Sequence, residues 1–127
     1  MRVGRKDSTS QHNAYRKRSK QALDYAVDQI RKSPLAPYVR AVYVFGSYAR
    51  NEETFRSDVD LLLELDQSFD MERGRGDIVR LKSHVNPQEL SLPEVDLKIV
   101  QGPGWRDSQE LFYQNVRRDG ENIWNPR

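Results

Sequence analysis

Three acidic residues have the types and spacing of a metal-binding carboxylate cluster. Asp58 and Asp60 are separated by one residue at the start of a predicted strand, residues 59–65. Alternate strand residues point to one face, so these two carboxylates lie together, with Cα atoms ~6.5–7 Å apart. Asp96 lies one residue into another alternating apolar segment, again opposite its buried positions. If the two strands are neighbours, ~4.8 Å apart, all three carboxylates converge on one small volume.

Carboxylates so close together repel one another unless a cation neutralises them. The chain has no cysteine and only two histidines, His12 and His84, which excludes thiolate zinc sites, thiol nucleophiles and multi-histidine centres. A site made of hard oxygen ligands favours Mg²⁺ or Mn²⁺. Mg²⁺ held by few carboxylates keeps open coordination positions, and these suit the phosphates of a nucleotide.

Gly46 and Ser47 supply a complementary feature. They follow a predicted strand, residues 39–45, and precede residues 48–53, for which we expect a turn or two of helix. Free backbone N–H groups at such a turn attract phosphate, and glycine allows close approach to the backbone. Either feature alone is more typical of an ordinary turn or a solvated strand face. Their joint arrangement predicts phosphoryl-type transfer from a nucleoside triphosphate.

At this point the chain resembles a known family, the DNA polymerase β-like nucleotidyltransferase superfamily, and within it the minimal nucleotidyltransferase (MNT) group. The superfamily signature GS-x₁₀-D-x-D is matched by Gly46-Ser47-Tyr48-Ala49-Arg50 and Ser57-Asp58-Val59-Asp60-Leu61-Leu62-Leu63. The segment Val95-Asp96-Leu97 resembles the third acidic strand of the group, and residues 112–124 resemble its closing helix and tail. The resemblance covers roughly residues 39–124.

The resemblance implies a nucleotidyltransferase fold and transfer of a nucleoside monophosphate, AMP from ATP, to a hydroxyl with release of pyrophosphate. It also implies roles for six residues. The catalytic metal ligands would be Asp58, Asp60 and Asp96, and Asp96 would help deprotonate the attacking hydroxyl. The β- and γ-phosphates would be held by Gly46 and Ser47, with Arg50 adding positive charge near the triphosphate.

Two residues depart from the pattern of the family. Asn51 and Glu53 stand where the family commonly has a glycine and a small residue, which makes the loop bulkier and more acidic. Asparagine tolerates the left-handed backbone conformation, so the path of the loop need not change. Glu53 would either repel a triphosphate or face water.

Lone members of the MNT group resemble antitoxins that silence a HEPN-family ribonuclease toxin by adenylylating it, so the implied partner is a HEPN-type toxin. Two alternatives remain open. The chain could block a partner by occlusion, without catalysis. It could instead modify a small molecule such as an aminoglycoside. Binding such an acceptor usually needs a second domain. A second copy of the chain could supply that surface in a homodimer, and the sequence leaves a homo-oligomeric state open.

The sequence predicts an α+β fold of the nucleotidyltransferase type, with a small mixed sheet of three or four strands flanked by helices. The polar segment 1–12 is expected to be a flexible basic arm, and residues 13–127 to form a single domain. Further predicted elements are a helix from about Asn13 to Ser33-Pro34, a helix within 71–85, a strand at 94–100 and a helix at 108–119 followed by Gly120.

Charge and hydropathy limit the partners. Residues 1–20 contain seven basic residues and one acidic residue, without the interleaved aromatics of a nucleic-acid stacking surface, which does not favour nucleic-acid binding. The longest apolar run, residues 41–45, is far shorter than the ~20 residues that span a bilayer. With no signal-peptide pattern either, the sequence predicts a cytoplasmic protein without membrane contact.

Overall fold

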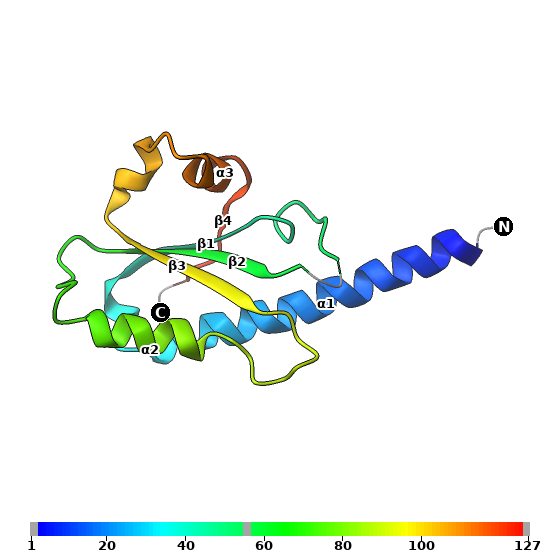
Figure 1. The fold of residues 1–127 in the computed structure, drawn as a ribbon, viewed down its shortest axis with the longest axis horizontal. Helices are drawn as coiled ribbons and strands as arrows, with labels where there is room; N and C mark the ends of the chain where they lie inside the picture. The colour runs from blue at the N-terminus through cyan, green and yellow to red at the C-terminus, as the bar shows by residue number, and fades with distance from the viewer. Residues whose placement is uncertain (1–2, 55–56, 126–127) are drawn as a thin grey trace.

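A computed structural model describes residues 3–54 and 57–125 of the chain, with side chains from residue 11 onward (Figure 1). The centre of the fold is a four-stranded mixed sheet in the order β3-β2-β1-β4. β2 pairs antiparallel with β1 and parallel with β3, while β4 pairs antiparallel with β1. The strands are β1 (Val39–Phe45), β2 (Val59–Leu65), β3 (Val95–Gln101) and β4 (Glu121–Asn122). The predicted α+β class with a small mixed sheet is confirmed.

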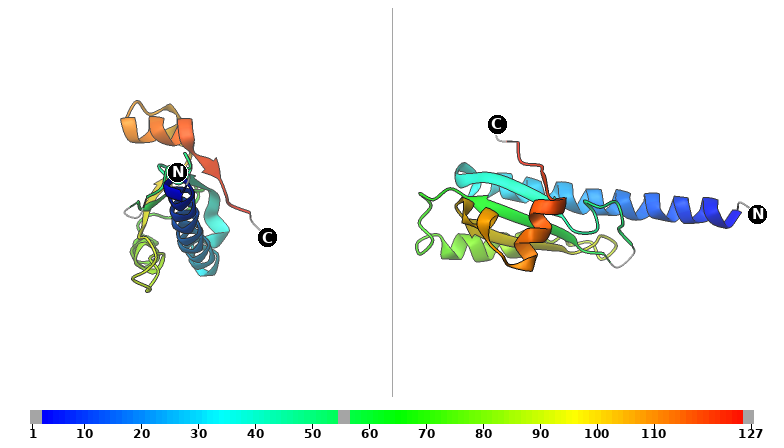
Figure 2. Two further views of the ribbon diagram at one scale, coloured as in Figure 1. Left: turned by 90° about the vertical axis from the view of Figure 1, so that its right-hand side faces the viewer. Right: turned by 90° about the horizontal axis from the view of Figure 1, so that it is seen from above.

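Helices cover both faces of the sheet, with different elements on each side (Figures 1 and 2). The long helix α1 and the short helix α2 pack on one face, and α3 lies on the other with the 3₁₀ turn η2. The helical elements are α1 (Val3–Lys32), η1 (Ala36–Tyr38), α2 (Arg75–His84), η2 (Pro103–Asp107) and α3 (Leu111–Asp119). Among the described residues no helix is long and apolar enough to cross a membrane.

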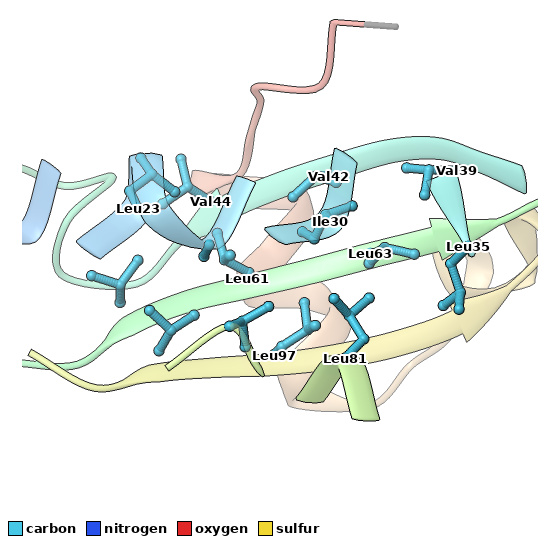
Figure 3. Close-up of a cluster of buried hydrophobic side chains, with 14 of the residues drawn as sticks. Leu23, Ile30, Leu35, Val39, Val42, Val44, Leu61, Leu63, Leu81 and Leu97 are labelled. Atoms are coloured by element: carbon cyan, nitrogen blue, oxygen red, sulfur yellow. The ribbon is translucent and has the colours of Figure 1, made fainter. Parts of the chain in front are cut away.

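The main core lies between the sheet and the helices α1 and α2 (Figure 3). Strand β2 runs through its middle, and its alternate residues Val59, Leu61, Leu63 and Leu65 are completely buried. Each such side chain contributes ~1.5–3 kcal/mol through removal of apolar surface from water. A smaller cluster on the opposite face is made by Phe45, Leu62, Trp105 and Val116. Core residues therefore occupy both faces of β2.

The start of α1 differs from the prediction. A helix was expected from about Asn13 after an arm at 1–12, but the helix begins at Val3 and extends beyond the sheet (Figure 1). The physical reason is that a nucleated helix gains one hydrogen bond for each added residue, even where side chains are polar. The segment contains no proline to stop it, and its Gly4 costs only ~1 kcal/mol.

Other boundaries differ by less. Residues 48–51 form hydrogen-bonded turns in place of the helix expected over 48–53. α3 begins at Leu111, three residues later than predicted, because residues 108–110 after η2 are not helical. β4 was not predicted, since two residues are too short for a pattern of alternation. The Ile123 N–H donates to the Val42 carbonyl at 2.8 Å, which ties this tail to β1.

Candidate active site

Asp60 and Asp96 lie side by side on adjacent strands. They are register partners in the parallel pairing of β2 and β3. Partners in register project to the same face, and here it is the face opposite the main core. Asp58 lies two residues before Asp60 at the same end of the sheet, and it is exposed. The two strands are neighbours, which meets the condition on which convergence of the carboxylates depended.

The pKa of Asp60 reflects this crowding of negative charge. It is raised from the ordinary 3.8 to about 6, first because partial burial penalises the charged form and then because Asp96 and Asp58 repel it. Arg50 and Lys98 act in the opposite direction, but their effect is smaller. The described side chains therefore leave uncompensated negative charge at the start of β2, and a bound cation would offset it.

The three aspartates can be compared with the ligands that a divalent cation requires. Carboxylate oxygens are the ligands that Mg²⁺ and Mn²⁺ prefer, so the residue types fit. In the part of the chain that the structure describes, no three His, Cys, Asp or Glu side chains already form a group close enough to hold a metal ion. The register fixes the backbones of Asp60 and Asp96, whereas the exposed Asp58 side chain is free of the core and can turn toward an ion.

The glycine-serine bend lies directly against Asp60. Phe45, the last residue of β1, is the register partner of Asp60, and Gly46 follows it with a φ of 74°. A Cβ atom built on Gly46 would overlap the Asp60 Oδ2 oxygen. Glycine is required here both by the left-handed backbone conformation and by the close approach of the carboxylate.

The bend continues as a series of turns from Gly46 to Glu52. The Arg50 N–H donates to the Gly46 carbonyl at 3.1 Å, and the Glu52 N–H donates to the Ser47 carbonyl at 2.8 Å. The N–H groups of Ser47, Tyr48 and Ala49 donate no hydrogen bond within residues 3–54 and 57–125. Backbone N–H groups left in this way at a tight turn suit a phosphate. The expected helix is absent, but its N–H groups are present.

Arg50, which the resemblance places near the triphosphate, is engaged with two carboxylates. Its Nε donates to Glu52 at 2.6 Å, and one terminal nitrogen lies 3.2 Å from Asp119 at the end of α3. The pKa of Asp119 is lowered to about 2, chiefly because Arg118 donates to it and also because Arg50 does. Sequence reasoning missed this link between the bend and α3, because the two residues are distant in the chain.

Glu53 is buried and paired with α1, which the sequence did not suggest. Its side chain is only 1% exposed, and Arg16 of α1 donates to Glu53 Oε2 at 2.8 Å. His12 Nε2 lies 3.2 Å from the other carboxylate oxygen and 3.2 Å from the Asn51 side-chain oxygen. Glu53 therefore does not face water, and that expectation is wrong. Its pairing with Arg16 also means that it is not a free charge beside the bend. Asn51 adopts the left-handed conformation with a φ of 59°, as its residue type allows.

A surface hollow of about 380 Å³ opens beside Asp58. One wall comes from α1 through Tyr15, Arg18 and Ser19, and the opposite wall is the segment 90–94 before β3. Asp58 is therefore accessible from the side of this hollow as well as from the side of the bend.

Comparisons with known proteins show the family and the fold of the chain. Residues 30–126 match the protein family described as Polymerase beta, Nucleotidyltransferase. A protein of Methanocaldococcus jannaschii named "Putative protein adenylyltransferase" is 38% identical over 50 residues, covering 35% of this chain and 51% of that protein. The chain thus matches about half the length of this relative.

Two solved structures are also similar. A "putative nucleotidyltransferase" from Sulfolobus solfataricus superposes with a TM-score of 0.59 and 19% identity, over 91% of this chain and 87% of that one. A toxin-antitoxin structure with AMP-PNP gives a TM-score of 0.48 and 20% identity, over 80% of this chain and 72% of that one. The first of these likenesses shows the fold of the chain.

Proposed function

The chain belongs to the polymerase β nucleotidyltransferase family, and we propose that it transfers AMP from ATP to a hydroxyl group of a protein in a Mg²⁺-dependent reaction. The observation that carries this proposal is the register pairing of Asp60 with Asp96 beside the bend at Gly46. The pairing supplies oxygen ligands for a cation, and the bend supplies unbonded N–H groups for phosphate, at one end of the sheet.

In this proposal the three carboxylates hold the metal and the bend holds the nucleotide. Asp58, Asp60 and Asp96 would be the ligands, and a bound Mg²⁺ would neutralise the charge of the phosphates and polarise the reacting one. Gly46 and Ser47 would bind the β- and γ-phosphates through their N–H groups and the serine hydroxyl. Arg50 would add positive charge beside them, oriented by its contact with Asp119.

The proposed transfer of AMP from ATP to a hydroxyl needs no further reactant. The acceptor oxygen attacks the α-phosphorus and forms a new P–O bond, while the bond from that phosphorus to the β-phosphate bridging oxygen breaks. Pyrophosphate leaves with the electron pair of the broken bond. The proton of the attacking hydroxyl passes to Asp96 and from there to water. Asp96 suits this role because it lies on β3, which is an edge strand of the sheet.

For the acceptor we propose a HEPN-type toxin, with this chain as its antitoxin. Support comes from the resemblance of the motifs to the MNT group, and from the name of the relative in M. jannaschii, a protein adenylyltransferase. The hollow beside Asp58 makes that carboxylate accessible to a group on a protein surface.

The direct test uses ATP labelled on the α-phosphate, Mg²⁺, the purified chain and a HEPN toxin encoded next to it. We expect label on the toxin, and a loss of at least ~100-fold in rate for Asp60→Asn and for Asp96→Asn, because each removes a ligand needed in the transition state. Asp107→Asn, an exposed aspartate in η2, is the matched control and should leave the rate unchanged.

The outcomes separate the alternatives. Label transfer that is unaffected by Asp60→Asn would rule out the proposed mechanism. Equal neutralisation of the toxin by the wild type and by the aspartate variants would favour occlusion without catalysis. Label recovered on an added aminoglycoside, with none on the toxin, would assign a small-molecule acceptor.

A further inference from the structure

Helix α1 contacts the bend through two residues on one helical face. His12 and Arg16 are four residues apart, which places them one above the other on the helix. Arg16 donates to the Tyr48 carbonyl at 3.1 Å and to Glu53 Oε2 at 2.8 Å. The Arg16 guanidinium also lies over the Tyr48 ring, 4.3 Å from its centroid. One arginine thus contacts the main chain, an aromatic ring and a carboxylate of the same loop.

The burial of Glu53 indicates that its role depends on Arg16. A carboxylate that is only 1% exposed is costly unless a positive charge and hydrogen bonds compensate it. Glu53 Oε1 makes no hydrogen bond within the described residues, although His12 Nε2 lies 3.2 Å away. The hydrogen bond from Arg16 to Oε2 is therefore the main compensation, and in return Glu53 fixes the guanidinium over Tyr48.

The bend is also held from outside. Gly46 and Asn51, at its two ends, both have positive φ, a conformation that glycine adopts freely and asparagine tolerates. The Tyr48 carbonyl accepts one hydrogen bond inside the bend, from the Asn51 N–H at 3.0 Å, and its second bond comes from Arg16. Helix α1 therefore supplies a hydrogen bond that the bend does not make by itself.

We propose that Arg16, fixed by Glu53, is a positioning residue that holds the bend at residues 46–51 in the conformation that receives the triphosphate. This inference rests on the proposed function and extends it. Arg16 acts through Tyr48, one residue after the Ser47 hydroxyl, and does not itself contact the nucleotide. The two residues that depart from the family pattern, Asn51 and Glu53, are both contacted by α1, as is Tyr48.

The test measures binding of Mg²⁺–AMP-PNP to the full chain by calorimetry, together with KM and kcat for ATP. Arg16→Met keeps an unbranched apolar stem and removes the charge and the donors. We expect its Kd and its KM for ATP to rise about 5- to 20-fold with a smaller change in kcat, because a displaced bend weakens nucleotide binding. The matched control is Lys17→Met, the adjacent exposed basic residue of α1, which should leave both values unchanged.

The number of binding sites per chain distinguishes a positioning role of Arg16 from a loss of folded protein. A variant that only unfolds in part lowers the number of binding sites per chain at an unchanged Kd, whereas a misplaced bend raises Kd with all sites present. Arg16→Lys and Glu53→Gln are milder variants. Lysine keeps a charge but not the planar fork, so Arg16→Lys should restore part of the affinity. The double variant Arg16→Met/Glu53→Gln should bind about as weakly as Arg16→Met alone, because the pair acts as a unit.

Two results would overturn the inference in distinguishable ways. If the wild type binds Mg²⁺–AMP-PNP and both Arg16 variants bind it as tightly as Lys17→Met does, the positioning role is wrong and the proposed function stands. If the wild type itself binds no Mg²⁺–nucleotide, the proposed function fails, and the positioning role fails with it.

Discussion

Asp60 and Asp96 are register partners on neighbouring parallel strands, and their carboxylates share one face of the sheet. The bend at Gly46 closes over Asp60 from the antiparallel side, where β1 ends. Two strands and one turn therefore bring acids and phosphate-binding groups together from three segments spread over about 50 residues of the chain. Partial burial and the repulsion between the acids raise the pKa of Asp60 to about 6.

Asp60→Asn should stabilise the metal-free chain near neutral pH. Since the native pKa of about 6 lies above the ordinary 3.8, the stability linked to this group is present below pH 3.8 and is lost as pH rises through 6. Asparagine stays neutral, so we expect the variant to gain ~1 kcal/mol at pH 7.5 after allowance for solvent screening. In EDTA this corresponds to a rise of about 2–5 °C in Tm, with no difference at pH 4.

Mg²⁺ should reverse the order of stability of the wild type and Asp60→Asn. A cation that binds the native carboxylates stabilises the wild type by mass action, whereas a site that lacks Asp60 binds it poorly. We expect Tm of the wild type to rise with MgCl₂ at pH 7.5, and Tm of Asp60→Asn to change by less than about 1 °C. An equal rise in both proteins, measured by differential scanning calorimetry, would contradict the assignment of Asp60 as a ligand.

Gly46→Ala should damage both the fold and the site. The new methyl group would overlap Asp60 Oδ2, at a position whose φ of 74° already disfavours alanine. We expect a loss of about 2–4 kcal/mol in the free energy of unfolding, measured in urea. Gly104→Ala is the control, because no atom lies within 4 Å of its added Cβ. That substitution should change stability by about 0.5 kcal/mol or less.

Asp119→Asn should lower stability at neutral pH and have little effect in acid. Hydrogen bonds from Arg118 and Arg50 lower the pKa of Asp119 to about 2. Its contribution is therefore present above pH 3.8 and is lost as pH falls through 2. Thermal melts of wild type and variant should differ at pH 7 and converge toward pH 2. A difference that stays constant over this range would show that Asp119 acts through contacts other than its charge.

Much of the fold could be predicted from the chain. The bounds of β1 and β2 agree with the prediction, because alternating apolar residues between turn residues define a strand well. The predicted membership in the nucleotidyltransferase superfamily is confirmed by the match over residues 30–126. The roles of the six predicted site residues remain predictions, although the structure places Asp60 beside both Asp96 and Gly46.

The contacts that support the site could not be predicted in the same way. Arg16 and Glu53 are 37 residues apart, and Arg50 and Asp119 are 69 apart. Each of these charges is typical of a solvated surface when the sequence alone is considered, because charge pairs between distant elements have no local pattern. Only the packing of α1 and α3 around the bend brings them together.

The alternation of side chains along β2 and β3 has a consequence for the register of these strands. Each acid lies between two core residues, Asp60 between Val59 and Leu61 and Asp96 between Val95 and Leu97. A slip of either strand by one residue would drive a carboxylate into the apolar interior and expose the neighbours that belong there. A mispaired form would therefore bury a charge as well as separate the acids, so the pattern that specifies the fold also specifies their alignment.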